Sequence, residues 1–257
     1  MFNITPRTAT IGAQIDGIDL SHPLDDAREK LVAALDDHKV LVFHDQHGVG
    51  PSELLALASA FGKPEIADHP VLPQHPDVPG VYVIVSDAAD PSIAGDSWHT
   101  DGATRESTAW VTLLQSVDVP PYGRDTLFAD AEAIYDSLSD GMKEFLDGKN
   151  AVQAWGKYKP EAPGIEHPIV TSNPRTGRKR LYVNRMYTQS IVGLHPDESS
   201  CILEYLFGLA KVPEMQFRVS WGPTTIAVWD NESTSHYGVR DYPYRRVQHR
   251  VMALREG

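Results

Sequence analysis

The stretch SWHTDGATRESTAWVTLLQSV, residues 97–117, joins a pair of polar residues to a long apolar segment. His99 and Asp101 stand one residue apart, and the residues from Ser107 onward favour an extended strand. Residues i and i+2 of an extended segment project from the same side, so both side chains can point into a fold. The sequence therefore raises the hypothesis of a metal site beside a core strand.

Two other His-x-Asp pairs have different surroundings. His195 and Asp197 flank Pro196 before an apolar helical segment, and proline followed by acidic residues is typical of a helix start. His75 and Asp77 lie in the proline-rich stretch VLPQHPDVPG, which predicts a surface turn. Only the pair at 99 and 101 is expected to point into the fold.

The length and composition limit the domain organisation. The chain has 257 residues, enough for one large hydrophobic core. It contains no Gly/Ser tract, no block of like charge and no internal repeat that would mark a linker or an array. We therefore expect a single domain over residues 1–257.

The charge and cysteine content narrow the partners and the location. The formal net charge of −12 disfavours binding to a phosphate backbone, so we expect no nucleic-acid partner. The single cysteine, Cys201, excludes an intramolecular disulfide, and the N-terminal residues lack the layout of a signal peptide. No apolar run approaches the ~20 residues that a membrane span needs. A cytoplasmic protein with no membrane partner is expected.

Strands outnumber helices along the chain. Helical spacing or helix-start residues predict helices over 25–38, 51–62, about 130–147 and 197–210. Apolar and β-branched segments predict strands over 39–43, 81–86, 107–117, 180–184, 215–221, 224–230 and 245–254. This order favours a mainly β fold with flanking helices, a sandwich or jelly roll, over a doubly wound sheet. Nucleotide-binding glycine motifs are absent from the sequence.

A third metal ligand must come from elsewhere in the chain. Two histidines and one carboxylate form the facial triad of non-haem Fe(II) oxygenases, and His236 follows the predicted strand that ends at Asp230. A lone histidine beside aromatic residues is more often a hydrogen-bonded structural residue than a ligand. Whether His236 is a metal ligand or a structural residue therefore depends on the other residues that accompany it in the sequence.

Three motifs in order carry a family resemblance: SWHTDG at 97–102, GRDTLF at 123–128 and WDNESTSHYGVRDYPYRRVQHR at 229–250. Together they resemble the taurine dioxygenase family of Fe(II)- and 2-oxoglutarate-dependent oxygenases, with weaker similarity over nearly the whole chain. The resemblance implies a double-stranded β-helix, which is a jelly roll. It also implies that His99, Asp101 and His236 bind Fe(II), leaving positions for 2-oxoglutarate and O2.

The resemblance further implies that Arg246 and Thr126 bind the distal carboxylate of 2-oxoglutarate. A guanidinium can donate two parallel hydrogen bonds to a carboxylate, and a threonine hydroxyl can add another. An alternative is that the arginines near 246 lie on a solvated strand edge. On a strand Arg246 and Arg250 share one face, and we favour an inward face that binds anions.

The expected substrate pocket departs from that of taurine dioxygenase. His69 and Arg250 match residues that hold the sulfonate, whereas Leu72 and Gly95 stand where that enzyme has polar side chains near the amine. Gly102 replaces a bulkier apolar residue, and Tyr187 falls at an aromatic pocket position. The resemblance thus implies a small organic anion whose tail is less polar than that of taurine.

The predicted activity is hydroxylation of a C–H bond of such a sulfonate, sulfate or carboxylate, with succinate and CO2 as coproducts. Two alternatives remain from the residues alone. A zinc hydrolase could use the same histidines and aspartate, and a jelly-roll binding module would need no metal. By analogy with the family we also expect a homo-oligomer.

Overall fold

The computed structural model describes residues 2–66, 69, 72–87, 95–156, 159–241 and 244–255. Among these residues the largest sheet has eight strands in the order β1-β2-β3-β14-β6-β16-β4, with β5 also paired to β16. Its strands are β1 (Asn3–Pro6), β2 (Ala13–Asp16), β3 (Val40–Phe43), β4 (Lys63–Pro64), β5 (Tyr82–Ser86), β6 (Val111–Asp118), β14 (Ile226–Asp230) and β16 (Arg246–Leu254). Every pairing is antiparallel except that of β2 with β3.

A second sheet of three strands, in the order β13-β7-β15, faces the large one. Its strands are β13 (Gln216–Val219), β7 (Thr126–Asp130) and β15 (Thr234–Gly238). Two smaller sheets lie farther out: β12 (Thr188–Ile191), β8 (Asn150–Gln153) and β9 (Ile165–Pro168) form one, and β10 (Val170–Ser172) and β11 (Lys179–Leu181) form the other.

Successive side chains of a strand point to opposite faces of the sheet, so the large sheet packs against a different layer on each face. Val40, Val42 and Trp229 of the large sheet pack with Phe128 of β7 and Val219 of β13 in one buried cluster. The intervening residues of the large sheet face the opposite way and pack against α1 (Ala27–His38) and α2 (Pro51–Ser59). Two face-to-face sheets with period-2 alternation are the jelly-roll arrangement that the sequence predicted.

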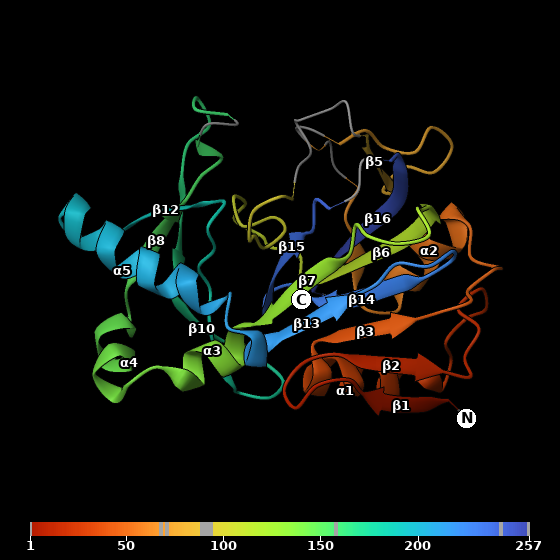
Figure 1. Cartoon of the computed structure of the whole chain (residues 1–257), viewed down its shortest axis with the longest axis horizontal. Helices are drawn as coiled ribbons and strands as arrows, with labels where there is room; N and C mark the ends of the chain where they lie inside the picture. Colours follow the sequence, from red (N-terminus) through yellow and green to blue (C-terminus); the bar gives the residue numbers. More distant parts are fainter. Residues whose placement is uncertain are drawn as a thin grey trace.

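The other face of the three-stranded sheet is covered by helices. Leu127 and Ala129 of β7 pack in a cluster with residues of α3 (Ala131–Ser137) and α5 (Pro196–Leu209). Figure 1 shows these helices, with α4 (Asp140–Leu146) and the two smaller sheets, at one end of the molecule, and α1 and α2 beside the large sheet at the other. A short 3-10 helix, Pro213–Met215, precedes β13.

Capping residues explain where the helices begin. The single helix expected over 130–147 is two helices, because Leu138 is extended and the Ser139 hydroxyl accepts a hydrogen bond from the Met142 amide at the start of α4. The helix start expected at His195 is confirmed, since His195 caps α5 and Pro196 occupies the first turn.

The predicted strands are found with shorter bounds, and several others were missed. The strand expected over 180–184 ends at Leu181 in β11. Strands that the sequence analysis did not predict are β1, β2, β4, β7, β8, β9, β10, β12 and β15. These are two to five residues long, and alternation over so few residues does not by itself distinguish a strand from a loop. Within the described part of the chain, the search for membrane-spanning helices finds none of the necessary length and apolarity.

Candidate metal centre and cosubstrate pocket

Backbone pairing brings His99 and His236 together. The His99 amide donates to the His236 carbonyl over 3.0 Å, and the His236 amide donates to the His99 carbonyl over 2.8 Å. This isolated bridge joins the loop before β6 to β15, so the two imidazole rings lie 4.0 Å apart between centroids. Main-chain hydrogen bonds thereby hold as neighbours two residues that are far apart in the chain.

Asp101 is fixed to the same region by Asn231, which lies in the turn between β14 and β15. The Asp101 amide donates to the Asn231 side-chain oxygen over 3.0 Å, and the Asn231 amide nitrogen donates to the Asp101 carbonyl over 2.7 Å. The same nitrogen donates to the Ala109 carbonyl over 2.9 Å. The loop that carries His99 and Asp101 is therefore attached at both ends to the hairpin that carries His236.

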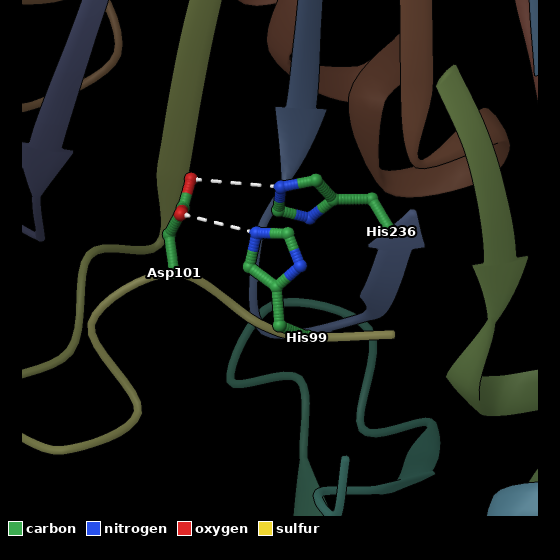
Figure 2. A group of neighbouring side chains, drawn as sticks. All are labelled: His99, Asp101 and His236. Carbon is green, nitrogen blue, oxygen red and sulfur yellow. Dashed lines mark ion pairs between the residues drawn. The ribbon is translucent and has the colours of Figure 1, made fainter. Parts of the chain in front are cut away.

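The three side chains converge on one point (Figure 2). Asp101 Oδ1 is 3.9 Å from His99 Nε2, and Asp101 Oδ2 is 4.0 Å from His236 Nε2. All three residues are buried, and one potential ligand atom from each lies within 4.8 Å of the others. Among the described residues this is the one group of three or more His, Cys, Asp or Glu with such geometry.

The protonation states suit a divalent metal. Burial lowers the pKa of His99, and it lowers the pKa of His236 to about 3, so both imidazoles are neutral at neutral pH. Burial opposes ionisation of Asp101, but the positive charge of Arg250 opposes this effect most strongly, and the pKa of Asp101 is lowered to about 2. His99 Nδ1 lies 2.8 Å from the Ser97 carbonyl, an arrangement that places the ring proton on Nδ1 and leaves Nε2 as a ligand. Two neutral imidazole nitrogens and one carboxylate that approach a metal ion from the same side leave its other side open, which is the arrangement of a facial metal site.

Thr126 and Arg246 lie in the same cavity as these three residues. The Thr126 hydroxyl accepts a hydrogen bond from Trp221 Nε1 over 3.0 Å, which leaves its own proton to donate. Arg246 Nη1 donates to the Arg124 carbonyl over 2.6 Å. Burial and the charge of Arg124 lower the pKa of Arg246 to about 10, so the guanidinium remains charged at neutral pH.

Several buried N–H groups around the cavity have no hydrogen-bond partner among the described residues. They include the ring nitrogen Nε1 of Trp229, the amide nitrogen of Gln248, and the Nε atoms of Arg246 and Arg250. Unpaired buried donors cost free energy, so the cavity is suited to a ligand rich in acceptors. A dicarboxylate with a keto group, such as 2-oxoglutarate, meets this requirement.

The six residues expected at the substrate also line the cavity: His69, Leu72, Gly95, Gly102, Tyr187 and Arg250. Arg250 Nη1 donates to Asp101 Oδ1 over 2.8 Å, so the expected anion-binding residue touches the expected metal ligand. His69 Nδ1 accepts from the Leu72 amide over 3.1 Å, and burial together with Arg250 lowers its pKa to about 4. His69 is thus a neutral imidazole whose proton is on Nε2.

The backbone conformation also favours glycine at positions 95 and 102. Gly95 has φ +104° and Gly102 has φ +69°, conformations that other residues adopt only with strain. A Cβ at Gly95 would lie 3.5 Å from His99 Cε1. Their lack of side chains therefore follows from the loop geometry and also keeps space open beside the metal ligands.

Sequence reasoning missed part of the cavity wall. Trp155 lies 6.1 Å from His69 and 5.4 Å from Tyr187 between ring centroids, and Tyr187 lies 6.4 Å from His99. No sequence motif marks Trp155 as a residue of the cavity wall. Other lining residues that were missed are Ile84, Thr104, Arg105, Leu114, Met186, Gly238, Gln248 and Met252. For Gln248 a signal existed, because the period of a strand puts it on the face of Arg246 and Arg250.

Two sequence-based interpretations need correction. The strand-edge alternative for the arginines is wrong, because β16 lies inside the sheet between β6 and β5 and both Arg246 and Arg250 are buried. Trp98 and Trp229 each flank a segment that carries expected metal ligands, so the sequence alone predicts that both form walls of the metal site. Trp229 lines the cavity, whereas Trp98 packs in the cluster beneath α3 and α5.

Comparison with known proteins agrees with this geometry. Residues 3–252 match the family model described as taurine catabolism dioxygenase TauD, TfdA family. An alkylsulfatase of Acinetobacter baylyi is 30% identical over 95% of this chain and 81% of its own length. An alpha-ketoglutarate-dependent sulfate ester dioxygenase of Pseudomonas putida is 30% identical over 93% of this chain and 85% of its own length. A crystal structure of a taurine dioxygenase from Burkholderia xenovorans superposes with a TM-score of 0.89 and 32% identity, covering 99% of this chain and 90% of that one.

The fold and the donor set define the class of the protein as a non-haem iron oxygenase. The chain belongs to the TauD, TfdA family, and it is an Fe(II)- and 2-oxoglutarate-dependent dioxygenase that uses O2. This membership favours the dioxygenase over the zinc hydrolase and the binding module that the residues alone had left open.

Proposed function

We propose that the enzyme hydroxylates a C–H bond of a small organic anion, a sulfonate, sulfate or carboxylate whose tail is less polar than that of taurine. In this proposal His99, Asp101 and His236 hold Fe(II), and Thr126 and Arg246 bind the distal carboxylate of 2-oxoglutarate. Arg250 and His69 bind the anionic group of the substrate. Leu72, Gly95, Gly102 and Tyr187 shape the space for its tail.

The observation that carries the proposal is the position of Arg250. Arg250 is 7% exposed, lines the cavity and donates to Asp101, so an anion that it binds would lie beside the metal ligands. His69 lines the same cavity with a neutral ring that can donate through Nε2. The names of the two relatives, an alkylsulfatase and a sulfate ester dioxygenase, support an anionic substrate.

The tail of the substrate would meet apolar surface. Leu72, Trp155, Met186 and Tyr187 line the cavity. A small ammonium group there would lose its hydration without a full set of partners, which typically costs ~1–3 kcal/mol for each missing hydrogen bond. An alkyl or aryl tail instead gains from leaving water, by about 25 cal/mol per Å² of buried apolar surface.

Each residue has a defined task in the reaction. Iron and 2-oxoglutarate, when bound, supply the O2 chemistry that yields succinate, CO2 and the hydroxylated product. The neutral His99 and His236 and the ionised Asp101 keep the ligand set ready for metal without loss of a proton at neutral pH. Trp155 and Tyr187 exclude water from one side of the cavity, and Arg250 holds the substrate in one orientation.

The test is succinate formation across a panel of alkyl sulfates, sulfonates and carboxylates of increasing tail length, each paired with an uncharged analogue of the same shape. We expect the anions with apolar tails to outcompete taurine, with modest steps because one methylene contributes only ~1–3 kcal/mol. The best turnover with taurine would overturn the assignment of the tail pocket. Equal turnover of charged and neutral analogues would remove Arg250 from the substrate site.

The remaining expectations concern the whole protein. We propose that residues 1–257 act as one catalytic domain, that the enzyme is cytoplasmic and forms a homo-oligomer, and that nucleic acid and membrane are not partners. The net charge of −12 supports the exclusion of nucleic acid. Light scattering at enzyme concentrations used in assays tests the assembly, and a monomer at all concentrations would contradict it.

A further inference from the structure

Strand β16 carries a third polar side chain on the face that holds Arg246 and Arg250. Gln248 stands between the two arginines, is 1% exposed and lines the same cavity. Neighbours on one face of a strand are roughly 6–7 Å apart. The amide of Gln248 therefore lies in the middle of a row whose two ends are cationic.

Gln248 differs from the other buried glutamines of this protein. Gln115 donates to the Val49 carbonyl over 2.5 Å, and Gln153 accepts from the Thr188 hydroxyl over 3.0 Å. Gln46 accepts from the Leu20 amide over 2.9 Å. The Gln248 side chain makes no hydrogen bond to any residue that the structure describes, and its amide nitrogen is fully buried. Because an unpaired buried amide is costly, this side chain needs a partner that the described protein does not supply.

The surroundings identify the chemistry of that partner. Trp229 Nε1 and the Nε atoms of Arg246 and Arg250 are also unpaired donors around the cavity. An amide can rotate to present either its NH2 group or its oxygen, and among these donors the missing group must be an acceptor. The row begins at Arg246, the proposed partner of the distal carboxylate, and ends at Arg250, which donates to the metal ligand Asp101. Gln248 stands between these two ends of the row and lines the cavity that also contains the metal ligands.

We infer that Gln248 is a cosubstrate-binding residue that donates a hydrogen bond from Nε2 to an oxygen of 2-oxoglutarate. This inference rests on the proposed function, because it takes Arg246 as the anchor of the distal carboxylate. It adds an uncharged donor between the two arginines, so the cosubstrate is recognised along its length as well as at its ends.

The experiment measures binding of 2-oxoglutarate to the Fe(II)-loaded enzyme by calorimetry without O2, so no turnover enters the result. Gln248→Met keeps the length of the side chain and removes the donor, and we expect affinity to fall about tenfold, which corresponds to about 1.4 kcal/mol. Gln248→Glu keeps the shape and puts a carboxylate beside the carboxylates of the ligand, and we expect a larger loss.

The matched control is Gln115→Met. Gln115 lies on β6 in register with His249 of β16, and its side chain points to Val49 on the other face of the sheet. This variant should lose stability and keep the wild-type affinity for 2-oxoglutarate. Because Gln248→Glu is isosteric, it also tests the inference if the methionine variant fails to fold.

The Arg246→Lys variant distinguishes failure of the inference about Gln248 from failure of the proposed function. If Arg246→Lys weakens 2-oxoglutarate binding and both Gln248 variants bind it as the wild type does, the inference about Gln248 is wrong and the proposed function stands. If neither position affects the affinity, the proposed cosubstrate site itself is wrong. A defect of Gln248→Met confined to the KM of the prime substrate would also overturn the inference.

Discussion

Asp101 receives the largest share of the polar contacts at the metal centre. Arg250 donates to Oδ1, Thr112 donates to Oδ2 over 3.3 Å, and Asn231 binds both main-chain groups. Burial raises the pKa of Asp101, but the charge of Arg250 is the main opposing effect, and the pKa is lowered to about 2. The carboxylate is therefore ionised and oriented before any metal arrives, which reduces the cost of metal binding.

At this scale we predict that His99→Ala, Asp101→Ala and His236→Ala each abolish stoichiometric Fe(II) binding, because two protein ligands cannot maintain a facial site. Equilibrium dialysis of the purified variants measures it. Asp197→Ala at the start of α5 is the control, since Asp197 belongs to a His-x-Asp pair that caps a helix and should affect stability at most. Full iron content in Asp101→Ala would show that the metal site lies elsewhere.

Substitutions of the two arginines of β16 should weaken the binding of different molecules. Arg246→Lys replaces a bidentate group by a single ammonium, so we expect the KM for 2-oxoglutarate to rise about tenfold or more with any prime substrate. Arg250→Ala should mainly raise the KM for the prime substrate. Steady-state kinetics with each substrate varied in turn separates the two effects. A defect of both variants confined to the prime substrate would refute the assignment of Arg246.

Among the elements, the turn between β14 and β15 sets the geometry of the centre through Asn231. Asn231→Ala should weaken metal binding by roughly 10–100-fold, the usual effect of losing a group that orients a ligand. Asn173→Ala is the matched control: Asn173 is equally buried, and its side chain binds Asp36 and the Arg175 amide away from the cavity. Metal titrations and unfolding midpoints of the metal-free proteins test the prediction. Equal loss of metal affinity in both variants would reduce Asn231 to a structural role.

How well each strand was predicted depended on its composition as well as on its length, since β3, β11 and β13, of three or four residues, lie in stretches whose apolar and β-branched residues predicted strands. The nine residues of β16 lie in such a stretch too, and the period of two along a strand then puts Arg246 and Arg250 on one face. The five residues of β15 gave no such signal, and His236 was found by its motif. The bridge between His99 and His236 depends on main-chain hydrogen bonds between distant segments, which no local pattern encodes.

At the scale of the whole molecule, the cavity forms where segments from most of the chain meet. The jelly roll and the proposed ligand residues could be predicted, because the motifs that resemble the family lie on its strands and adjoining loops. Trp155 and Met186 could not, since they reach the cavity from segments after β8 and before β12, outside the two facing sheets. Their position depends on how a small sheet packs beside a larger one, and that packing leaves no periodic trace in the sequence.

The same burial that prepares the site makes the metal-free protein sensitive to acid. Burial is the first cause of the lowered pKa values of His69, His99, His236 and His249. The ordinary value is 6.5, and the pKa of His69 is about 4, so below pH 6.5 the unfolded chain binds more protons than the native protein. The free energy of unfolding must then fall as the pH decreases from 6.5 toward 4. Glu132 and Asp230, whose pKa values are raised chiefly by burial, act in the opposite direction once carboxylates titrate.

We therefore predict that the thermal midpoint of the metal-free protein is lower at pH 5.5 than at pH 7.5, a window in which the histidines dominate over carboxylates of ordinary pKa. Calorimetry in buffers of equal ionic strength measures it. His69→Gln, which keeps a polar side chain but removes the titrating ring, should show a smaller decrease over the same window. A midpoint that is constant or higher at pH 5.5 would mean that these rings take up protons in the native protein, and the neutral imidazoles assigned to the metal centre would then be wrong.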